Sequence, residues 1–218
     1  MAFRGDVVQQ RMSAWRDSLL VDHAVFRLIW TNFSEVYPGL YRSNHPTPGQ
    51  LAGATRRLGL TTLINLRGRR FCGSDALSRD AASRLGLQHV DMAFESRGAP
   101  HRERILRFHS IIADLRGPAL MHCKSGADRA GLASGLAVLF AGGTATEALR
   151  QLSWRFGHWT AARTGILDAF FQLYAREAEG RLEFLEWVRD EYDEEALRRS
   201  FTAQGFASFI TDRVLRRE

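Results

Sequence analysis

Apolar and polar positions alternate along the first two thirds of the chain in segments of two kinds. Short apolar runs have the length and composition of buried strands, and they occupy residues 61–66, 87–94 and 118–121. Longer segments carry apolar residues at helical spacing, and they occupy residues 48–58, 75–85, 101–115 and 130–141. This alternation predicts an α/β fold of three layers, in which helices flank a mostly parallel central sheet.

Capping residues mark several helix boundaries. Thr47 precedes Pro48, which is the arrangement of an N-cap followed by a proline in the first turn. Ser74 is expected to cap the helix that follows it. The segment Thr144–Glu147 has the sequence of a capping box and predicts a helix that continues to about Phe156.

The last third of the chain has a helical pattern throughout. Helices are expected at residues 164–179 and 181–192, with one or two more before the end. We therefore expect a single domain over residues 1–218 that has three consecutive parts. These are an N-terminal accessory segment at about 1–36, a core at 37–160, and a helical extension at 161–218 that packs on the core.

Composition indicates a globular protein with a sizeable core. Of the 218 residues, 45% are hydrophobic, and the net charge is +6. The basic charge suits partners that carry phosphate, but zinc-finger spacings and RNA-binding aromatic motifs are absent from the sequence, so nucleic acid is not an expected partner. Two cysteines and an N-terminus without an apolar run predict a cytoplasmic protein.

The most informative motif is the run His-Cys-Lys-Ser-Gly-Ala-Asp-Arg at residues 122–129, called the cysteine loop below. It lies between a predicted buried strand and a predicted buried helix. The first amides of a helix have no partner within the helix, and together with the helix dipole they bind anions. The sequence therefore predicts a phosphate-binding loop that contains a nucleophile.

Two side chains of the cysteine loop supply the expected chemistry. At a helix N-terminus beside a guanidinium, the thiolate form of Cys123 is favoured and is nucleophilic. Arg129 can bind two oxygens of a phosphoryl group while phosphorus is attacked in line. The product is a cysteinyl phosphate, which water must cleave. The alternative is a buried structural cysteine beside an unrelated surface arginine.

The pattern His-Cys-x-x-Gly-x-x-Arg resembles the signature of the cysteine-dependent protein tyrosine and dual-specificity phosphatases. With Lys124 and Asp128 in the loop, the sequence is most similar to the bacterial and atypical dual-specificity branch. Further segments that resemble landmarks of that branch are Tyr41–Ser43 with Pro46, Ile64–Arg67 and Ser96–Pro100. The resemblance covers about residues 37–160, which makes the core a phosphatase core, and it implies a phosphate-binding set of Lys124, Ser125, Gly126, Ala127, Asp128 and Arg129.

The chain departs from the family pattern at the residue after the arginine. Relatives usually carry Ser or Thr there, and the hydroxyl stabilises the departing thiolate in the second step. This chain has Ala130. The resemblance therefore implies slow cleavage of the phospho-enzyme, unless Ser125 or a water molecule replaces that hydroxyl.

The general acid that protonates the leaving oxygen has two candidates. Asp91 lies 32 residues before Cys123, a separation found in several relatives, but it falls inside a predicted strand and could equally pair with a basic neighbour. Asp128 lies in the cysteine loop itself. It is the favoured donor, because an acid must come within hydrogen-bond distance of the leaving oxygen. Its alternative role is to bond loop amides or to pair with Arg97.

Other residues are expected to support the site. Arg67 and Arg97 each follow a predicted strand, at the end where open α/β sheets bind ligands, and with Lys124 they would favour a multiply charged substrate. His122 is expected to shape the loop by hydrogen-bonding its backbone. Cys72 is either an incidental small residue or, as in some relatives, a trap for the oxidised nucleophile.

The resemblance implies a phosphatase that acts on phosphotyrosine, phosphoserine or phosphothreonine in proteins. One alternative substrate class is phosphoinositides or inositol phosphates, and a further alternative is a weakly catalytic phosphate-binding protein. We expect no cofactor and no metal, because the remaining histidines lack ligand spacing. Trp15–Trp30 is expected to pack on the domain. The less favoured hypothesis is that this segment contacts a membrane surface.

Overall fold

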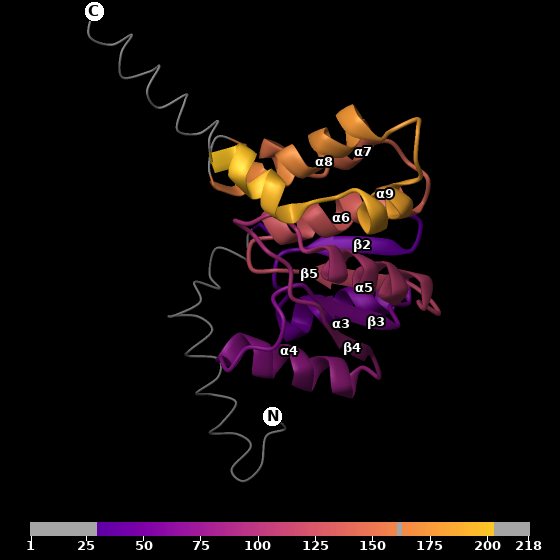
Figure 1. Ribbon diagram of the computed structural model, residues 1–218. Coiled ribbons are helices and arrows are strands. Elements are labelled where there is room, and N and C mark those ends of the chain that lie inside the picture. Colours follow the sequence, from indigo (N-terminus) through magenta and orange to yellow (C-terminus); the bar gives the residue numbers. More distant parts are fainter. Residues whose placement is uncertain (1–29, 161–162, 203–218) are drawn as a thin grey trace, which may run out of the picture.

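A computed structural model describes residues 30–160 and 163–202 of the chain (Figure 1). Its sheet has the strand order β1-β2-β5-β3-β4. The strands are β1 (Ser34–Tyr37), β2 (Leu40–Ser43), β3 (Thr62–Asn65), β4 (Gln88–Asp91) and β5 (Ala119–His122). All neighbouring pairs are parallel except β1 with β2. The predicted mostly parallel sheet is therefore confirmed.

Helices cover both faces of this sheet (Figure 1). They are α3 (Pro48–Leu58), α4 (Gly73–Arg84), α5 (Arg102–Ala113), α6 (Asp128–Phe140), α7 (Ala145–Leu149), α8 (Ile166–Glu177) and α9 (Phe184–Asp190), with short 3-10 turns at Trp154–Phe156 (η1) and Arg163–Gly165 (η2). Helices α3 and α4 pack on one face, and α5 and α6 pack on the other. The three-layer α/β prediction is confirmed.

The central strands contribute side chains to both faces, which explains why their middle residues are apolar on either side of the sheet. On β3, Leu63 packs with α3 and α4, whereas its neighbour Ile64 packs with α5 and α6. On β5, Leu120 and Met121 are divided in the same way. Successive side chains of a strand point to opposite faces, so a strand covered on both sides carries consecutive apolar residues instead of an alternating pattern.

Two predicted helix boundaries are wrong. The N-cap of α4 is Cys72 rather than Ser74, because the extended Cys72 already accepts the first helical bond, from the Ala76 amide. The helix that opens with the capping box at Thr144–Glu147 ends at Leu149 instead of Phe156. Its backbone tightens into short turns, and the Gln151 carbonyl accepts a bond from outside the helix.

The hairpin of β1 and β2 was not predicted. The two strands are antiparallel and turn at Gly39, whose positive φ of 88° favours glycine. Their sequences, Ser-Glu-Val-Tyr and Leu-Tyr-Arg-Ser, mix polar and apolar residues, so neither strand lies in an apolar run like the one that revealed β3. The predicted strand 87–94 is also shorter in the structure. It ends at Asp91, where Met92 turns its amide to the Asn65 carbonyl.

Helices α8 and α9 lie against α6 on the side away from the sheet (Figure 1). Phe171 of α8 packs so closely on Gly135 of α6 that a Cβ at Gly135 would lie 2.5 Å from the ring. Aromatic side chains of α8 and α9 stack on one another, for example Phe170 on Trp187. A further helical run covers 194–202, the last described residues.

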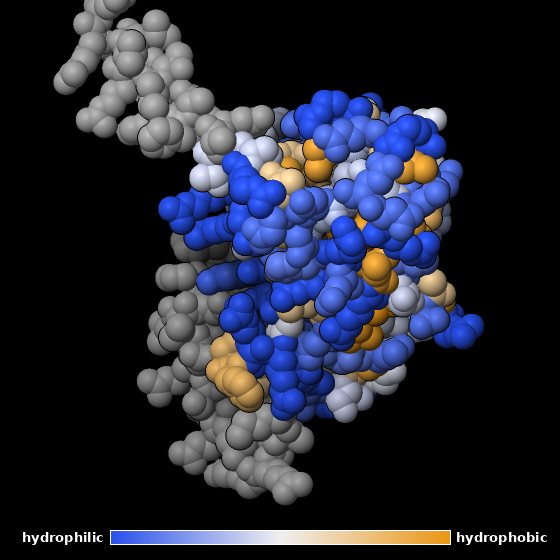
Figure 2. All heavy atoms as spheres, in the orientation of Figure 1, coloured by the Kyte–Doolittle hydropathy of each residue, from blue (hydrophilic) through white to orange (hydrophobic). Residues whose placement is uncertain are grey.

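The surface seen in Figure 2 is mostly hydrophilic, with small separate apolar patches. Within the described ranges, every helix is too short or too polar to cross a bilayer. The predicted accessory segment Trp15–Trp30 lies outside the described residues, apart from Trp30 itself.

Candidate active site

The cysteine loop connects the central strand β5 to helix α6, as the sequence predicts. Strand β5 lies between β2 and β3 and ends at His122, and α6 begins at Asp128. The loop therefore stands at the carboxyl end of the parallel strands, where α/β folds bind ligands.

Five backbone carbonyls of the cysteine loop accept hydrogen bonds from residues outside the loop. The donors are the Leu66 amide to His122, the His45 amide to Lys124, the Asn32 side chain to Ser125, and the Arg42 guanidinium to Gly126 and Ala127. The N–H and C=O groups of an extended peptide unit point in opposite directions, so carbonyls held outward direct the amides inward. Successive inward amides form an anion-binding concavity.

Arg42 is the main brace of the loop, although it is completely buried. Its Nη2 donates to the Gly126 carbonyl at 2.7 Å, its Nη1 donates to the Gln151 carbonyl at 2.8 Å, and its Cζ lies 4.0 Å from the ring centroid of Phe156. Burial lowers the pKa of Arg42 to about 10, against the opposing effect of nearby Cys123. The guanidinium therefore remains charged at neutral pH behind the loop.

Gly126 and Asn32 fix the middle of the loop. Gly126 has a φ of +76°, and a Cβ there would lie 2.7 Å from the Asn44 backbone nitrogen, so glycine is required for both conformation and space. The Asn32 side chain donates to the carbonyls of Ser125 at 3.0 Å and of Phe156 at 2.9 Å. It thereby ties the loop to the turn that follows α7.

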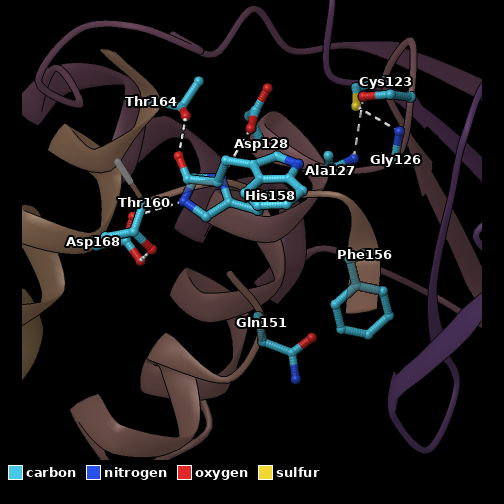
Figure 3. A network of polar contacts seen from close by, with 12 residues as sticks. Cys123, Gly126, Ala127, Asp128, Gln151, Phe156, His158, Thr160, Thr164 and Asp168 are labelled. Carbon is cyan, nitrogen blue, oxygen red and sulfur yellow. Dashed lines mark hydrogen bonds and ion pairs between the residues drawn. The ribbon is translucent and has the colours of Figure 1, made fainter. Parts of the chain in front are cut away.

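The Cys123 sulfur faces the backbone at Gly126 and Ala127 (Figure 3). The Gly126 amide donates to Cys123 Sγ over 3.2 Å. Only 2% of the residue is exposed, so the sulfur is shielded from bulk water. The Ser125 hydroxyl lies further along the loop and accepts a bond from the Ala127 amide at 3.4 Å.

Arg129 stands in the first turn of α6 beside the same sulfur. Its Nε donates to the Phe94 carbonyl at 2.9 Å, which fixes the direction of the side chain. Burial lowers the pKa of Arg129, Cys123 acts to raise it, and the nearby cations Arg67 and Arg70 lower it again. Arg67 thus lies close enough to the loop to interact with Arg129. Arg70 also lies close to Arg129, although the sequence analysis did not assign it to the site.

Asp128, the favoured acid, makes a contact that the sequence did not indicate. Its Oδ1 lies 2.9 Å from Nδ1 of His158, and Nε2 of the same ring lies 2.6 Å from Oδ2 of Asp168. These three residues, called the histidine trio below, come from α6, from the segment after η1, and from α8 (Figure 3). Thr160 donates to the other oxygen of Asp168.

The histidine trio shapes the charge beside the cysteine loop. The His158 side chain is fully buried, and 27% of the Asp128 side chain is exposed. Burial acts to lower the pKa of His158, but its hydrogen bonds to Asp128 and Asp168 raise that pKa to about 9. His158 is therefore an imidazolium at neutral pH.

Asp91, the other acid candidate, belongs to a second cluster, called the arginine trio below. Arg79 of α4 donates from Nε to Asp75 and from Nη2 to Asp91, each over 2.7 Å. Asn65 also donates to both carboxylates. Asp91 thus has the basic partner that the sequence left open as its alternative role.

His122 precedes the nucleophile and is completely buried. Burial, then the proximity of His45 and His89, lowers its pKa well below the ordinary value, against an opposing interaction with the Cys123 backbone, so the ring is neutral. The rings of His122 and His45 meet edge to face, with centroids 4.6 Å apart. Within the described part of the chain, neither ring nitrogen of His122 has a hydrogen bond of normal geometry.

The remaining predicted site residues lie as follows. Lys124, on the loop, and Arg97 are both exposed. Arg97 makes no hydrogen bond or ion pair among the described residues. Cys72 is a free, half-buried thiol whose Sγ lies 3.5 Å from the Ser74 hydroxyl. The roles of Arg97 and Cys72 stay predictions.

Sequence reasoning did not assign Asn32, His158 or Asp168 to the site. Asn32 and Ser125 are 93 positions apart, and no local pattern links them. Arg42 was noted only as part of the landmark Tyr41–Ser43. Its complete burial in a strand that ends beside the loop is visible only in the folded chain.

Comparison with known proteins agrees with this geometry. Residues 74–151 match the model of the tyrosine phosphatase family. A search of curated proteins found no match. The matched range contains β5, the cysteine loop and α6.

Solved structures share the fold at low sequence identity. TpbA of P. aeruginosa is 19% identical, with a TM-score of 0.53, over 79% of this chain and 91% of TpbA. A cysteine-to-serine variant of TpbA in complex with phosphotyrosine is 20% identical, with a TM-score of 0.54, over 73% of this chain and 88% of the TpbA chain. A variant of Tk-PTP is 17% identical, with a TM-score of 0.51, over 64% of this chain and 94% of Tk-PTP.

The part of the chain that matches the tyrosine phosphatase family includes the strand, loop and helix that hold Cys123 and Arg129. The chain is therefore similar to that family over residues 74–151, and it shares its fold with TpbA and Tk-PTP.

Proposed function

We propose that this protein hydrolyses phosphate monoesters through a cysteinyl-phosphate intermediate on Cys123. The observation that carries the proposal is the outward bracing of the loop carbonyls, together with the Gly126 amide that donates to the sulfur. Amides held in this direction in advance stabilise negative charge without reorganising during the reaction. The match to the tyrosine phosphatase family supports the same activity.

The first step uses Cys123 and Arg129. The thiolate attacks phosphorus, an S–P bond forms, and the bond from phosphorus to the leaving oxygen breaks. Arg129 faces the transferring group and offers its terminal nitrogens to two equatorial oxygens, since its Nε is already engaged by Phe94.

The second step requires water to cleave the S–P bond and return the thiolate. Ala130 is completely buried in the first turn of α6 and has no hydroxyl to stabilise that thiolate. The inward amides and the buried charge of Arg42 are the remaining stabilising groups near the sulfur. We expect this step to limit the rate.

The proposed substrates are phosphorylated proteins. A TpbA variant forms a complex with phosphotyrosine, so one protein of this fold binds that residue. One observation favours a second class, because Arg67 and Arg70 lie close to Arg129 and add charge beside the loop. That cluster suits a multiply charged ligand such as a phosphoinositide or an inositol phosphate.

Release of phosphate from p-nitrophenyl phosphate tests the proposal. Cys123→Ser is expected to abolish release, and Arg129→Lys is expected to lower kcat/KM by about 10²-fold or more, because lysine cannot bind two oxygens at once. Cys72→Ser is the matched control, since it removes the other thiol. Unchanged turnover by Cys123→Ser would exclude the cysteinyl mechanism.

Substrate class needs a separate comparison. Phosphopeptides, phosphoinositides and inositol phosphates are compared at one concentration by phosphate release from the wild-type protein. Phosphotyrosine peptides are expected to be hydrolysed fastest. A preference for inositol phosphates that disappears in Arg67→Gln would assign the site to the second class instead.

A further inference from the structure

The geometry of the histidine trio requires a proton in each of the two contacts of the His158 ring. Both ring nitrogens of His158 face carboxylate oxygens, at 2.9 Å for Asp128 and 2.6 Å for Asp168. A neutral imidazole has a proton on only one nitrogen, and its bare nitrogen would then face an anionic oxygen. Two protons are therefore needed, one in each contact.

Both of those protons lie in the contacts with the His158 ring, so the outer oxygen of Asp128 carries no proton unless it takes one from water. Whether a proton rests on His158 or on the Asp128 oxygen that it contacts, the trio carries one net negative charge. Figure 3 shows that one carboxylate oxygen of Asp128 turns to the His158 ring and the other turns away from it. The outer oxygen accepts a proton but has none to give.

We propose that His158, held by Asp168, positions Asp128 as an ionised carboxylate that serves as the base in hydrolysis of the cysteinyl phosphate. This inference rests on the proposed function and specifies its second step. It also means that the leaving oxygen departs in the first step without a proton from Asp128.

The second step then balances as follows. A water oxygen attacks phosphorus, the S–P bond breaks, and its electron pair returns to Cys123 as thiolate. One proton of the water goes to the outer oxygen of Asp128 and is later released to solvent, which the partly exposed carboxylate can reach. Inorganic phosphate leaves.

A first step in which Asp128 gives no proton favours substrates whose leaving oxygen is stable as an anion. The pKa of a phenol, about 10, is far below that of an alkyl alcohol, so phenolate leaves far more readily than alkoxide. Aryl phosphates, with phosphotyrosine as the protein example, are therefore the substrates of this site. Phosphoserine and other alkyl phosphates react slowly.

Pre-steady-state kinetics of the full-length protein separate the two steps. With p-nitrophenyl phosphate, the wild-type protein is expected to release a burst of nitrophenolate followed by slower turnover. Asp128→Asn is expected to keep the burst rate within about threefold and to lower the steady rate by about 10²-fold, the usual contribution of a positioned base. A burst rate that falls by 10²-fold would instead make Asp128 the acid and overturn the inference.

His158→Asn tests positioning rather than structure alone. Asparagine keeps a neutral N–H toward Asp128 but removes the cation. The loss of that cation is expected to lower the steady rate by about tenfold or more and to leave the burst rate within about threefold, because the positioned base serves the second step. An unchanged steady rate would show that His158 has only a structural role.

Asp168→Asn tests the contribution of the carboxylate that holds His158. It also keeps the inference testable if His158→Asn does not fold. The charged groups that face His158 among the described residues are Asp128 and Asp168, with Arg129 close to Asp128. Because the Asp168 carboxylate helps to keep His158 protonated, its loss is expected to move the alkaline limb to lower pH by about one unit. An unmoved alkaline limb contradicts the inference.

Failure of the inference and failure of the proposed function are distinguishable. If the wild-type protein gives no burst and no phosphate, the proposed function fails and with it the second step. If the wild-type protein is active and Cys123→Ser is not, but phosphoserine and phosphotyrosine peptides react at similar rates, only the inference fails.

Discussion

The histidine trio and the arginine trio share one arrangement and differ in the residue at the centre. In each, a cation lies between two carboxylates, His158 between Asp128 and Asp168 and Arg79 between Asp75 and Asp91. Both trios contain one of the two acids that the sequence proposed. An arginine cannot exchange its proton near neutral pH, whereas a histidine can.

Location separates the trios as clearly as chemistry does. Asp128 follows directly on the cysteine loop and precedes Arg129, while Asp91 ends strand β4 at the edge of the sheet. Although burial opposes it, hydrogen bonds to Asp75 and Asp91 raise the pKa of Arg79 above an already high value. The arginine trio is therefore a fixed brace between α4 and the sheet.

The largest difference between the trios is expected in catalysis. Asp128→Asn should lower kcat for p-nitrophenyl phosphate by about 10²-fold, and Asp91→Asn should change it by less than about threefold, because only the first carboxylate lies at the end of the cysteine loop. Steady-state kinetics of the two purified variants give the comparison. A larger loss in Asp91→Asn would exchange the roles of the two trios.

The second largest difference between the trios is expected in how stability depends on pH. The pKa of His158 is higher in the folded protein, at about 9, than its ordinary value of 6.5. Its stabilisation is therefore complete below about pH 6.5 and is lost as pH rises through 9, a change of about 2–3 kcal/mol. The arginine trio has no such dependence in that range.

Thermal unfolding between pH 6 and pH 10 measures this effect. The wild-type Tm should fall across that range by more than the Tm of His158→Asn, since the variant lacks the titrating group. Equal slopes for the two proteins would show that His158 is not protonated in the folded state at neutral pH.

A smaller effect is expected at the buried end of the arginine trio. The Asp75 side chain is 4% exposed and binds both Arg79 and Asn65. Asp75→Asn should cost about 1–2 kcal/mol of unfolding free energy, because it leaves a partly buried guanidinium with one fewer charged partner. Urea unfolding measures the loss, and phosphatase activity at low urea should remain.

The smallest effect is expected from Arg79→Lys. Arginine reaches Asp75 and Asp91 from two separate nitrogens, which a single ammonium cannot do in the same geometry. Because Arg79 is partly exposed, the cost should be about 0.5–1 kcal/mol. A cost as large as that of Asp75→Asn would mean that Asp91 matters more to the brace than its exposure suggests.

The sequence predicted the elements of the fold whose pattern is local. Thr47 caps α3 and Thr144 caps α7 as expected, because each capping box lies within four residues. The β1–β2 hairpin was missed, since its two strands mix polar and apolar residues and form no apolar run. The early end of α7 was also missed, because the Gln151 carbonyl is bound by Arg42, which lies 109 positions away.

The same distinction applies to the site. The motif from His122 to Arg129 is continuous, and one helix and one strand present it, so sequence alone located it. The groups that brace and charge the loop come from distant segments, namely Asn32, Arg42, His158 and Asp168. Their placement depends on tertiary packing, which spacing in the sequence does not encode.

The central claim is that phosphate passes through the Cys123 sulfur. Rapid acid quenching of Asp128→Asn with p-nitrophenyl phosphate, followed by mass spectrometry of the peptide that contains Cys123, tests it most directly. The account predicts one phosphoryl group on Cys123 in nearly every molecule of this variant, because the second step is slow. Continued release of phosphate with Cys123 unmodified would contradict it.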